Sequence, residues 1–193
     1  NGNVSVTVAD GNATLGNISA SGSVGLNAEN GQLVDDGNGN TRVKGDALDL
    51  TASNGIAVQT QANSVNAQVS GSGSVAIDEA DGLNRLTVNS ANGDVAVTSR
   101  TGNIGVDVVN ASGHAVSLNA NAGAIRDANN NAASNVNAQG VNLVAAGGIG
   151  QTGNAFDVNT QTLSGNGGTG GANLTSTSTS ALELASLSVT QGN

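Results

Sequence analysis

The sequence predicts an all-β fold of the parallel β-helix or solenoid type, with short strands and Gly/Asn-rich corners. Three observations lead to this prediction. Apolar residues alternate with small or polar residues over three to five positions, which is the period of a half-buried strand. Turn dipeptides such as Asn30-Gly31 and Asn92-Gly93 separate these segments. Gly and Asn each occur 29 times, whereas Pro, Cys, Met, Trp and Tyr are absent and Phe156 is the only aromatic residue.

The alternating segments are expected to be the strands, and no stretch shows a helical stripe of useful length. In chain order they are 4–8, 24–26, 48–50, 56–58, 75–77, 86–88, 95–97, 104–108, 116–118, 141–143, 182–184 and 187–189. Segments 86–88, 95–97 and 104–108 begin 9 residues apart, and a spacing of about 9 to 10 residues suits a regular all-β array. With three strands in each coil, this spacing predicts coils of about 27 to 30 residues, and hence about six or seven coils.

A longer repeat divides the sequence into two units, 1–91 and 92–193. NGNVSVT at 1–7 matches NGDVAVT at 92–98, and further matches continue along both units at a nearly constant offset. The Gly-rich segment 165–171 is interpreted as an insertion into the second unit. Neither unit has an obvious polar cap, which predicts one continuous solenoid cut from a longer array.

Tandem immunoglobulin-like sandwiches are the main alternative, because a repeat of about 92 residues also suits such a domain. A sandwich core is usually filled by large side chains, whereas each segment here offers only two or three Val, Leu or Ile residues. Those side chains suit the narrow interior of a β-helix, in which Asn residues of successive coils can form ladders. Gly and Asn at the corners are expected to adopt positive φ angles.

The repeat style resembles that of filamentous-haemagglutinin-like exoproteins, which are giant bacterial surface proteins exported by two-partner secretion or related routes. The matching stretches are the two unit openings, GAIRDANNNAASNVNAQGVNLVAAGGIGQ at 123–151 and LTSTSTSALELASLSVTQGN at 174–193. The resemblance implies a right-handed coil, an extracellular or bacterial cell-surface location, and a role as an adhesin or surface filament. It also implies that further copies of the repeat occur in the same chain, and that partners include host-cell or matrix glycans and proteins.

The densest acidic cluster, Asp78, Glu79 and Asp81, is a candidate Ca²⁺ site, because calcium takes oxygen ligands from flexible loops. The alternative is a solvated turn, and no other cofactor is expected. A second acidic group lies close in sequence to Arg42 and Lys44, which predicts local ion pairing. Its members are Asp35, Asp36, Asp46 and Asp49.

Composition argues against several activities. Polysaccharide-cleaving β-helices need paired carboxylates and aromatic platforms, and His114 is interpreted as a surface turn residue, so the chain is expected to be non-catalytic. A net charge of −9 argues against nucleic-acid binding, and no apolar run reaches the length of a membrane span. Candidate glycosylation sites of the Asn-x-Ser/Thr type are Asn3, Asn12, Asn17, Asn110 and Asn173.

The function that these observations favour is a structural rod or filament segment of a giant secreted or surface-anchored adhesin-like protein. Lateral or end-to-end self-association into fibres is expected, because an uncapped coil presents open strand edges. The alternative function is an adhesion module that binds glycans or proteins through its turns and the Gly-rich segment. An insertion into a solenoid is a common location for such a binding surface.

Overall fold

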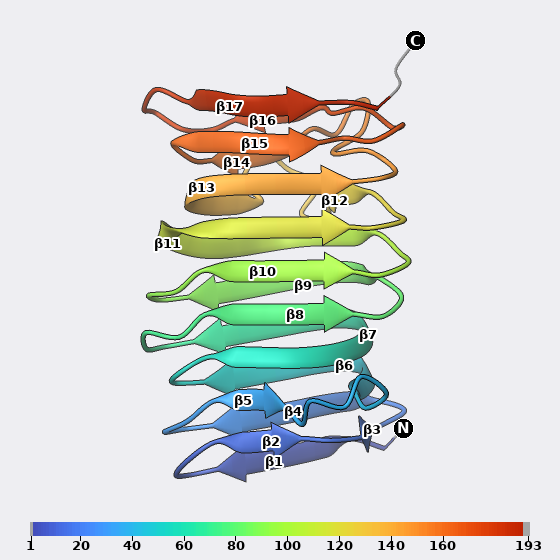
Figure 1. The fold of residues 1–193 in the computed structure, drawn as a ribbon, viewed down its shortest axis with the longest axis vertical. Coiled ribbons are helices and arrows are strands. Elements are labelled where there is room, and N and C mark those ends of the chain that lie inside the picture. Colours follow the sequence, from blue (N-terminus) through green and yellow to red (C-terminus); the bar gives the residue numbers. More distant parts are fainter. Residues whose placement is uncertain (1, 191–193) are drawn as a thin grey trace.

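The chain winds into a β-solenoid of about nine turns, in a computed structural model that describes residues 2–190 (Figure 1). All strand-to-strand pairings are parallel, and the described residues contain no helix, and so none that could cross a membrane. In Figure 1 the nearer strands run rightward and the more distant strands leftward while the chain rises from N- to C-terminus, which makes the coil right-handed. The predicted all-β, parallel β-helix is therefore confirmed.

The strands form two faces that lie against each other. The first face holds β1 (Val4–Val8), β4 (Ser23–Ala28), β9 (Leu83–Ser90), β14 (Phe156–Asn159) and β16 (Leu174–Ser176). The second face holds β2 (Ala13–Leu15), β5 (Leu33–Asp35), β8 (Val75–Glu79), β10 (Val95–Ser99), β15 (Thr162–Asn166) and β17 (Glu183–Ser188).

Four long strands turn a corner of the coil. They are β6 (Val43–Ala52), β7 (Ile56–Val69), β11 (Ile104–Ala120) and β13 (Val136–Ala145). The first half of β7 pairs with β8 on the second face, and its second half pairs with β9 on the first face. Two short strands complete the set: β3 (Ile18–Ser19) pairs with β6, and β12 (Ile125–Asp127) pairs with β11.

Each coil contains two strands, so the predicted coil of three strands is wrong. Val75 pairs with Val95, and Val95 pairs with Val116, so one coil extends from each of these valines to the next. The coils are therefore shorter than predicted, and there are about nine of them instead of six or seven. The side chains explain the difference. Val, Leu and Ala from the two faces fill the interior directly, so no third strand is needed to enclose a wider core.

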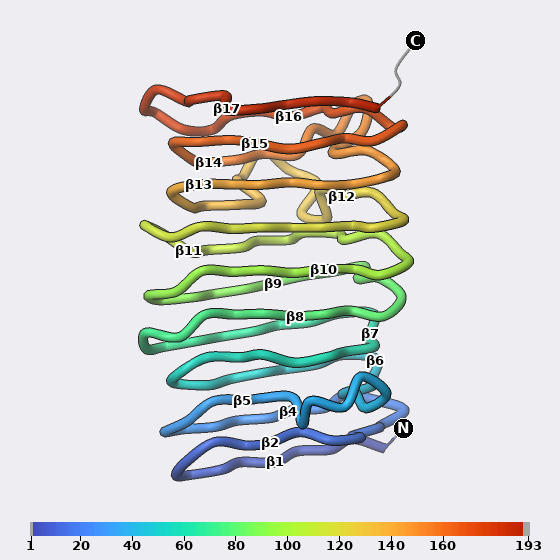
Figure 2. Tube along the Cα trace, in the orientation of Figure 1, coloured from blue at the N-terminus to red at the C-terminus, as the bar shows by residue number. Residues whose placement is uncertain are grey.

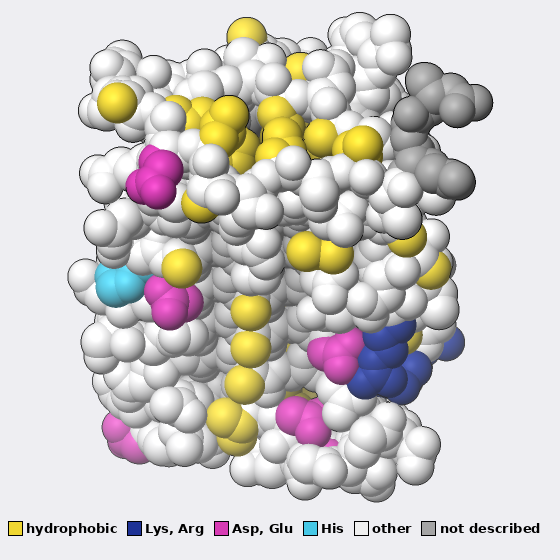
Figure 3. Space-filling view, turned by 45° about the horizontal axis from the view of Figure 1, so that its top comes forward, with side chains coloured by type: hydrophobic (Ala, Val, Ile, Leu, Met, Phe, Trp, Pro, Cys, Tyr) yellow, Lys and Arg dark blue, Asp and Glu magenta, His cyan; other side chains and the backbone are white. Residues whose placement is uncertain are grey.

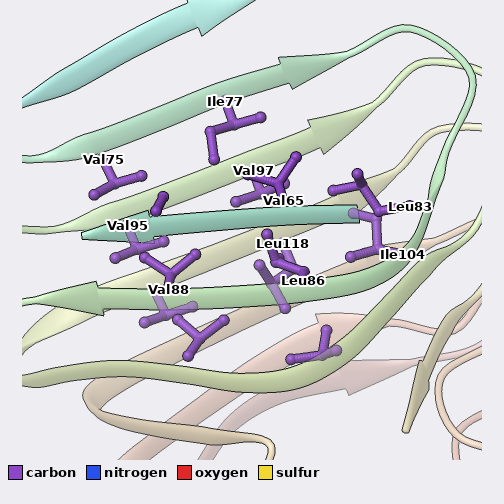
Figure 4. Packing of buried hydrophobic residues seen from close by; sticks show 14 of the residues in the cluster. Val65, Val75, Ile77, Leu83, Leu86, Val88, Val95, Val97, Ile104 and Leu118 are labelled. Atoms are coloured by element: carbon purple, nitrogen blue, oxygen red, sulfur yellow. The ribbon is translucent and has the colours of Figure 1, made fainter. Parts of the chain in front are cut away.

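The interior consists of apolar columns, one member per coil. Ile56, Val75, Val95, Val116 and Val141 follow each other in register on the second face, and each is at most 3% exposed. Figure 4 shows side chains of both faces pointing into this shared interior. The expected narrow core of stacked aliphatic side chains is confirmed.

The two sequence units do not occupy equivalent places in the coil. Val4 pairs with Val24 on the first face, whereas the matching Val95 pairs with Val116 on the second. The offset between the units thus amounts to about four and a half turns. Pairing continues through the junction at 91–92, where the Ala91 amide donates to the Val69 carbonyl oxygen at 3.0 Å.

The corners are built by glycine because successive coils approach closely there. A Cβ atom on Gly102 would collide with the carbonyl oxygen of Asp81, and one on Gly123 would collide with that of Gly102. Neither glycine has a positive φ. Ten other glycines among the described residues have a positive φ. Among the non-glycine residues of the same range, only Asn130 has one (53°). The expectation that Asn generally adopts positive φ at the corners is therefore wrong.

Asparagine instead links coils through its side-chain amide. Asn159 donates to Oδ1 of Asn137 at 3.2 Å, and Asn137 donates to Oδ1 of Asn110 at 2.8 Å. This series confirms the expected Asn ladder. The side chain of Asn103 uses a related contact, since its Oδ1 accepts from the Ala124 amide at 2.8 Å.

The Gly-rich segment 165–171 is a regular part of the stack and not an insertion. Leu143 pairs with Gly165 and Ile149 bridges to Ala172, so both sides of the segment stay in register with the preceding coil. The Thr169 amide donates to the Ala146 carbonyl oxygen of that coil at 3.0 Å. Glycine is needed here for the same close approach as at the other corners.

The real interruptions of the coil are the loops 36–42 and 128–135. Leu15 pairs with Asp35 and the nearby Ile18 pairs with Val43, so the segment between Asp35 and Val43 is longer than its counterpart in the preceding coil. The second loop is likewise longer than the segment beneath it, between the partners of Asp127 and Val136. Figure 2 shows the first loop as a blue curl that leaves the stack after β5.

The two end coils expose side chains whose neighbours in the stack are buried. Val6 of β1 is 46% exposed, whereas its partner Leu26 is 3% exposed. At the other end, Leu184 is 61% exposed and its partner Leu163 only 2%. Among residues 2–190, β1 and β17 each pair on one side only, and both expose apolar side chains.

Candidate functional site

The strand alternation of β8 separates the acidic residues that the sequence suggested as a calcium site. Val75 and Ile77 point into the core, so Glu79 points inward as well and is fully buried. Asp78 points outward between them. Asp81 follows at the exposed corner after the strand.

Asp78 is neutralised by a cation from the next coil. Arg100 donates from Nη2 and Nε to the two carboxylate oxygens, at 2.6 and 2.8 Å, and also donates to Gln59 at 3.2 Å. Such a two-pronged contact is the preferred geometry of an arginine with a carboxylate. Both carboxylate oxygens of Asp78 are thus already engaged.

Glu79 is fixed by hydrogen bonds on both of its oxygens. Oε2 accepts from the Thr60 hydroxyl at 2.7 Å, and Oε1 accepts from the backbone amides of Ala62, Ala80 and Asp81 at 3.1 to 3.3 Å. Burial raises the pKa of Glu79 to about 7, because the charged carboxylate loses its water. The carboxyl group therefore ties two successive corners together from inside the coil.

Asp81 remains ionised beside this buried acid. Partial burial acts to raise the pKa of Asp81, but hydrogen bonds from Glu79 and Gln61 outweigh it and hold this pKa below its ordinary value. The Gln61 amide donates to Oδ2 of Asp81 at 3.0 Å. Glu79 and Asp81 are therefore coupled neighbours, whereas Asp78 is held apart from them by Arg100, so the three acidic side chains do not converge on one point. Among residues 2–190, no group of three His, Cys, Asp or Glu side chains could hold a metal ion.

The predicted ion pairs of Arg42 and Lys44 are absent from the described residues. Asp46 and Asp49 accept from Asn63 and Asn66 of the next coil, at 2.7 and 2.9 Å. Asp35 and Asp36 accept from backbone amides within their own loop, at 2.7 and 3.0 Å. The ion-pair prediction is wrong. The carboxylates of these aspartates accept hydrogen bonds from backbone and side-chain amides instead of pairing with Arg42 or Lys44.

The five candidate glycosylation asparagines all use their amides between coils. Oδ1 accepts from a residue of the following coil at Asn3, Asn12, Asn17 and Asn110, and Nδ2 of Asn173 donates to the Gln151 carbonyl oxygen. Modification at these positions stays a prediction. The geometry gives the five residues a structural role in any case.

His114 lies at a half-exposed corner, with Nδ1 at 3.7 Å from the Asp94 carboxylate. The surface position agrees with the prediction, but His114 belongs to β11, at its register shift between Ala111 and Ala115, and not to a turn.

One buried polar group was missed by sequence reasoning. Asp127 points inward in register with Val106, and its Oδ1 accepts from Asn129, Asn130 and Asn135, which holds the loop 128–135. Among the described residues, its Oδ2 has no hydrogen-bond partner. The alternation after Ile125 was the signal, since it places residue 127 on the inner side.

Several shallow grooves lie on the described surface. On the second face, Ala57, Ala76 and Ala96 lie in register and form the floor of a hollow along the long axis, visible in Figure 3 as a column of hydrophobic side chains. A second groove lies beside the loop 36–42 and includes Arg42 and Lys44. The second groove combines charge and amide groups and is the better candidate for ligand recognition.

Comparison with known proteins gives no relative, since no family model, no curated protein and no solved structure matches the chain.

Proposed function

We propose that the chain is a structural rod segment of a giant secreted or surface-anchored bacterial protein of the filamentous-haemagglutinin-like type. The observation that carries this proposal is the parallel pairing of about nine successive coils, with exposed apolar side chains on β1 and β17. The mechanism is mechanical. Hydrogen bonds along the axis resist bending and extension, so the segment acts as a stiff spacer.

The one-sided pairing of β1 and β17 supports the array part of the proposal. All strands of one face run in the same direction, so the upper edge of one coil complements the lower edge of another. A further copy of the repeat, in the same chain or in a second molecule, would cover Leu184 and Leu187 at one end or Val6 at the other. Stability would then grow with each added nearest-neighbour contact.

The rod function is tested by joining two copies of the chain in tandem. Coils about 4.8 Å apart give a length of about 43 Å for nine turns, and the tandem protein should reach about twice that length at unchanged cross-section. Small-angle X-ray scattering and electron microscopy measure both quantities. Two beads joined by a flexible linker, or compact globules, would contradict the proposal.

The extracellular location is tested by fractionating the source bacterium with an antibody against the chain. Detection at the cell surface or in the medium is expected, and confinement to the cytoplasm would contradict this part of the proposal.

The alternative function, an adhesion module for glycans or proteins, draws its support from the loops 36–42 and 128–135. The Gly-rich segment gives it none, because that segment is a regular corner of the stack.

A further inference from the structure

The groove beside the loop 36–42 has the composition of a small anion-binding site. It has a volume of about 550 Å³, within the range of small-molecule sites. Arg42 and Lys44 line it, both adjoining the inward-pointing Val43. Ile18 and Ser19 of the preceding coil and Gln61 of the following coil line it as well. No carboxylate lines this groove.

The two cations are available for a ligand. Ion pairs within 4.0 Å among residues 2–190 involve Arg85, Arg100 and His114, and neither Arg42 nor Lys44 takes part in one. Within the same range, neither side chain donates a hydrogen bond to another residue. A guanidinium and an ammonium on one wall would together bind a carboxylate through charge-assisted hydrogen bonds.

Neutral polar groups surround the cations. The side chains of Asn40 and Ser19 line the groove and make no hydrogen bond to another described residue. Asn17 uses only its Oδ1, which accepts from the Arg42 amide at 3.3 Å, so its Nδ2 remains free to donate. Groups of this kind match the hydroxyls of a sugar.

The loop is held in place by its own hydrogen bonds. Thr41 Oγ1 donates to Asp36 at 2.5 Å. The backbone amide of Asn38 donates to the Asp36 carboxylate, and the backbone amide of Asn40 donates to Oδ1 of Asn38. These contacts lower the pKa of Asp36, with the Thr41 bond as the largest cause. The groove wall is therefore formed before a ligand binds.

The nearby charges limit the ligand to a single negative charge. Asp81 lies beside the groove, because it accepts from the lining residue Gln61, and the attraction of Lys44 contributes to the lowered pKa of Asp81. A net charge of −9 opposes an extended polyanion. We propose that this groove binds one acidic sugar residue, with its carboxylate on Arg42 and Lys44 and its hydroxyls on the amides.

The proposal holds whether or not the chain serves as a rod, and it is tested with sodium glucuronate as the probe. Two-dimensional NMR of the full chain should show saturable shifts at Asn17, Arg42 and Lys44. Glucose and sodium acetate should each bind at least about tenfold more weakly, because glucose lacks the carboxylate and acetate lacks the sugar hydroxyls. Equal binding of either one would overturn the proposal, as would tighter binding of a tetra-aspartate peptide.

Variants separate local recognition from the overall charge. Arg42→Gln and Lys44→Gln should each weaken glucuronate binding by about fivefold or more, and Asp81→Asn should strengthen it. Arg126→Gln is the matched control, because Arg126 is an exposed arginine outside the groove. Unchanged NMR spectra away from the groove verify folding. An equal loss of affinity in Arg126→Gln would contradict a specific site.

Discussion

At the scale of single residues, Glu79 shows how a polar group can join coils from the inside. It stands in register between Thr60 and Ser99, in a column that is otherwise lined by apolar or small side chains. Because its folded pKa of about 7 lies above the unfolded value of 4.5, the folded state binds more protons between these pH values. Stability contributed by the protonated form is complete below pH 4.5 and is lost as pH rises to about 7.

We expect the free energy of unfolding to fall by roughly 2 to 3 kcal/mol between pH 4.5 and pH 8 through this group. Glu79→Gln keeps the shape and hydrogen bonding of the neutral acid, so its stability should stay flat over this range and exceed that of the wild type at pH 8. Urea denaturation at a series of pH values measures the difference.

Asp78→Asn is the control, because Asp78 is a neighbouring acid that lies outside the core. It should keep the wild-type decrease in stability between pH 4.5 and pH 8. The lowered pKa of Asp81 acts in the opposite direction and only below about pH 3.8, where stability is lost as pH falls. A pH profile of Glu79→Gln that matches the wild type would contradict the assignment.

The inward position of Glu79 was readable from the sequence, since it continues the alternation of Val75 and Ile77. The calcium hypothesis grouped the acids by their proximity in sequence and ignored that alternation. The amide partners of Asp46 and Asp49 were not readable in the same way. They come from the following coil, and finding them required the length of the coil.

At the scale of elements, every predicted segment overlaps a strand, but neither the coil length nor seven of the strands were predicted. The strands without a predicted counterpart are β2, β3, β5, β12, β14, β15 and β16. Alternating Val and Ile residues mark strands wherever one side chain in two is buried, which is the case on both faces. The number of strands per turn depends instead on how far apart the faces pack. That distance follows from side-chain volume across the core, which a local pattern does not contain.

The corners allow a direct test of close backbone approach. Gly102→Ala places a Cβ against the Asp81 carbonyl oxygen, so it should lower the free energy of unfolding by about 1 to 3 kcal/mol. Gly140→Ala is the matched control, because no atom lies within 4 Å of the added carbon and φ is not positive there. Its stability should stay within about 0.5 kcal/mol of the wild type.

Both glycine variants are compared by urea denaturation at one pH. Similar losses in Gly102→Ala and Gly140→Ala would show that general strand flexibility, and not the corner contact, explains the glycine columns.

At the scale of the whole molecule, the exposed edges of β1 and β17 are the surfaces at which end-to-end association is expected. A contact between the C-terminal end of one molecule and the N-terminal end of the next is heterologous and does not close, so it builds filaments. Replacing Leu184 and Leu187 together by Lys should therefore abolish the growth of apparent mass with concentration in analytical ultracentrifugation. Both residues are exposed on β17, so folding should be retained.

Val144→Lys distinguishes end-to-end from lateral association, because Val144 is exposed on the side wall of the solenoid at 37%. This variant should associate like the wild type. A loss of association in Val144→Lys, with no loss in the doubly substituted end variant, would show that the molecules pack side by side.

The two sequence units are offset by about four and a half turns, so matching residues lie on opposite faces, and this has a consequence for any longer assembly. Successive units are related by a screw operation, a rotation of about 180° combined with a translation of about 22 Å for four and a half coils. A surface feature encoded in every unit would appear alternately on opposite sides of the fibre. Such a fibre would be two-sided and could engage partners on both flanks simultaneously.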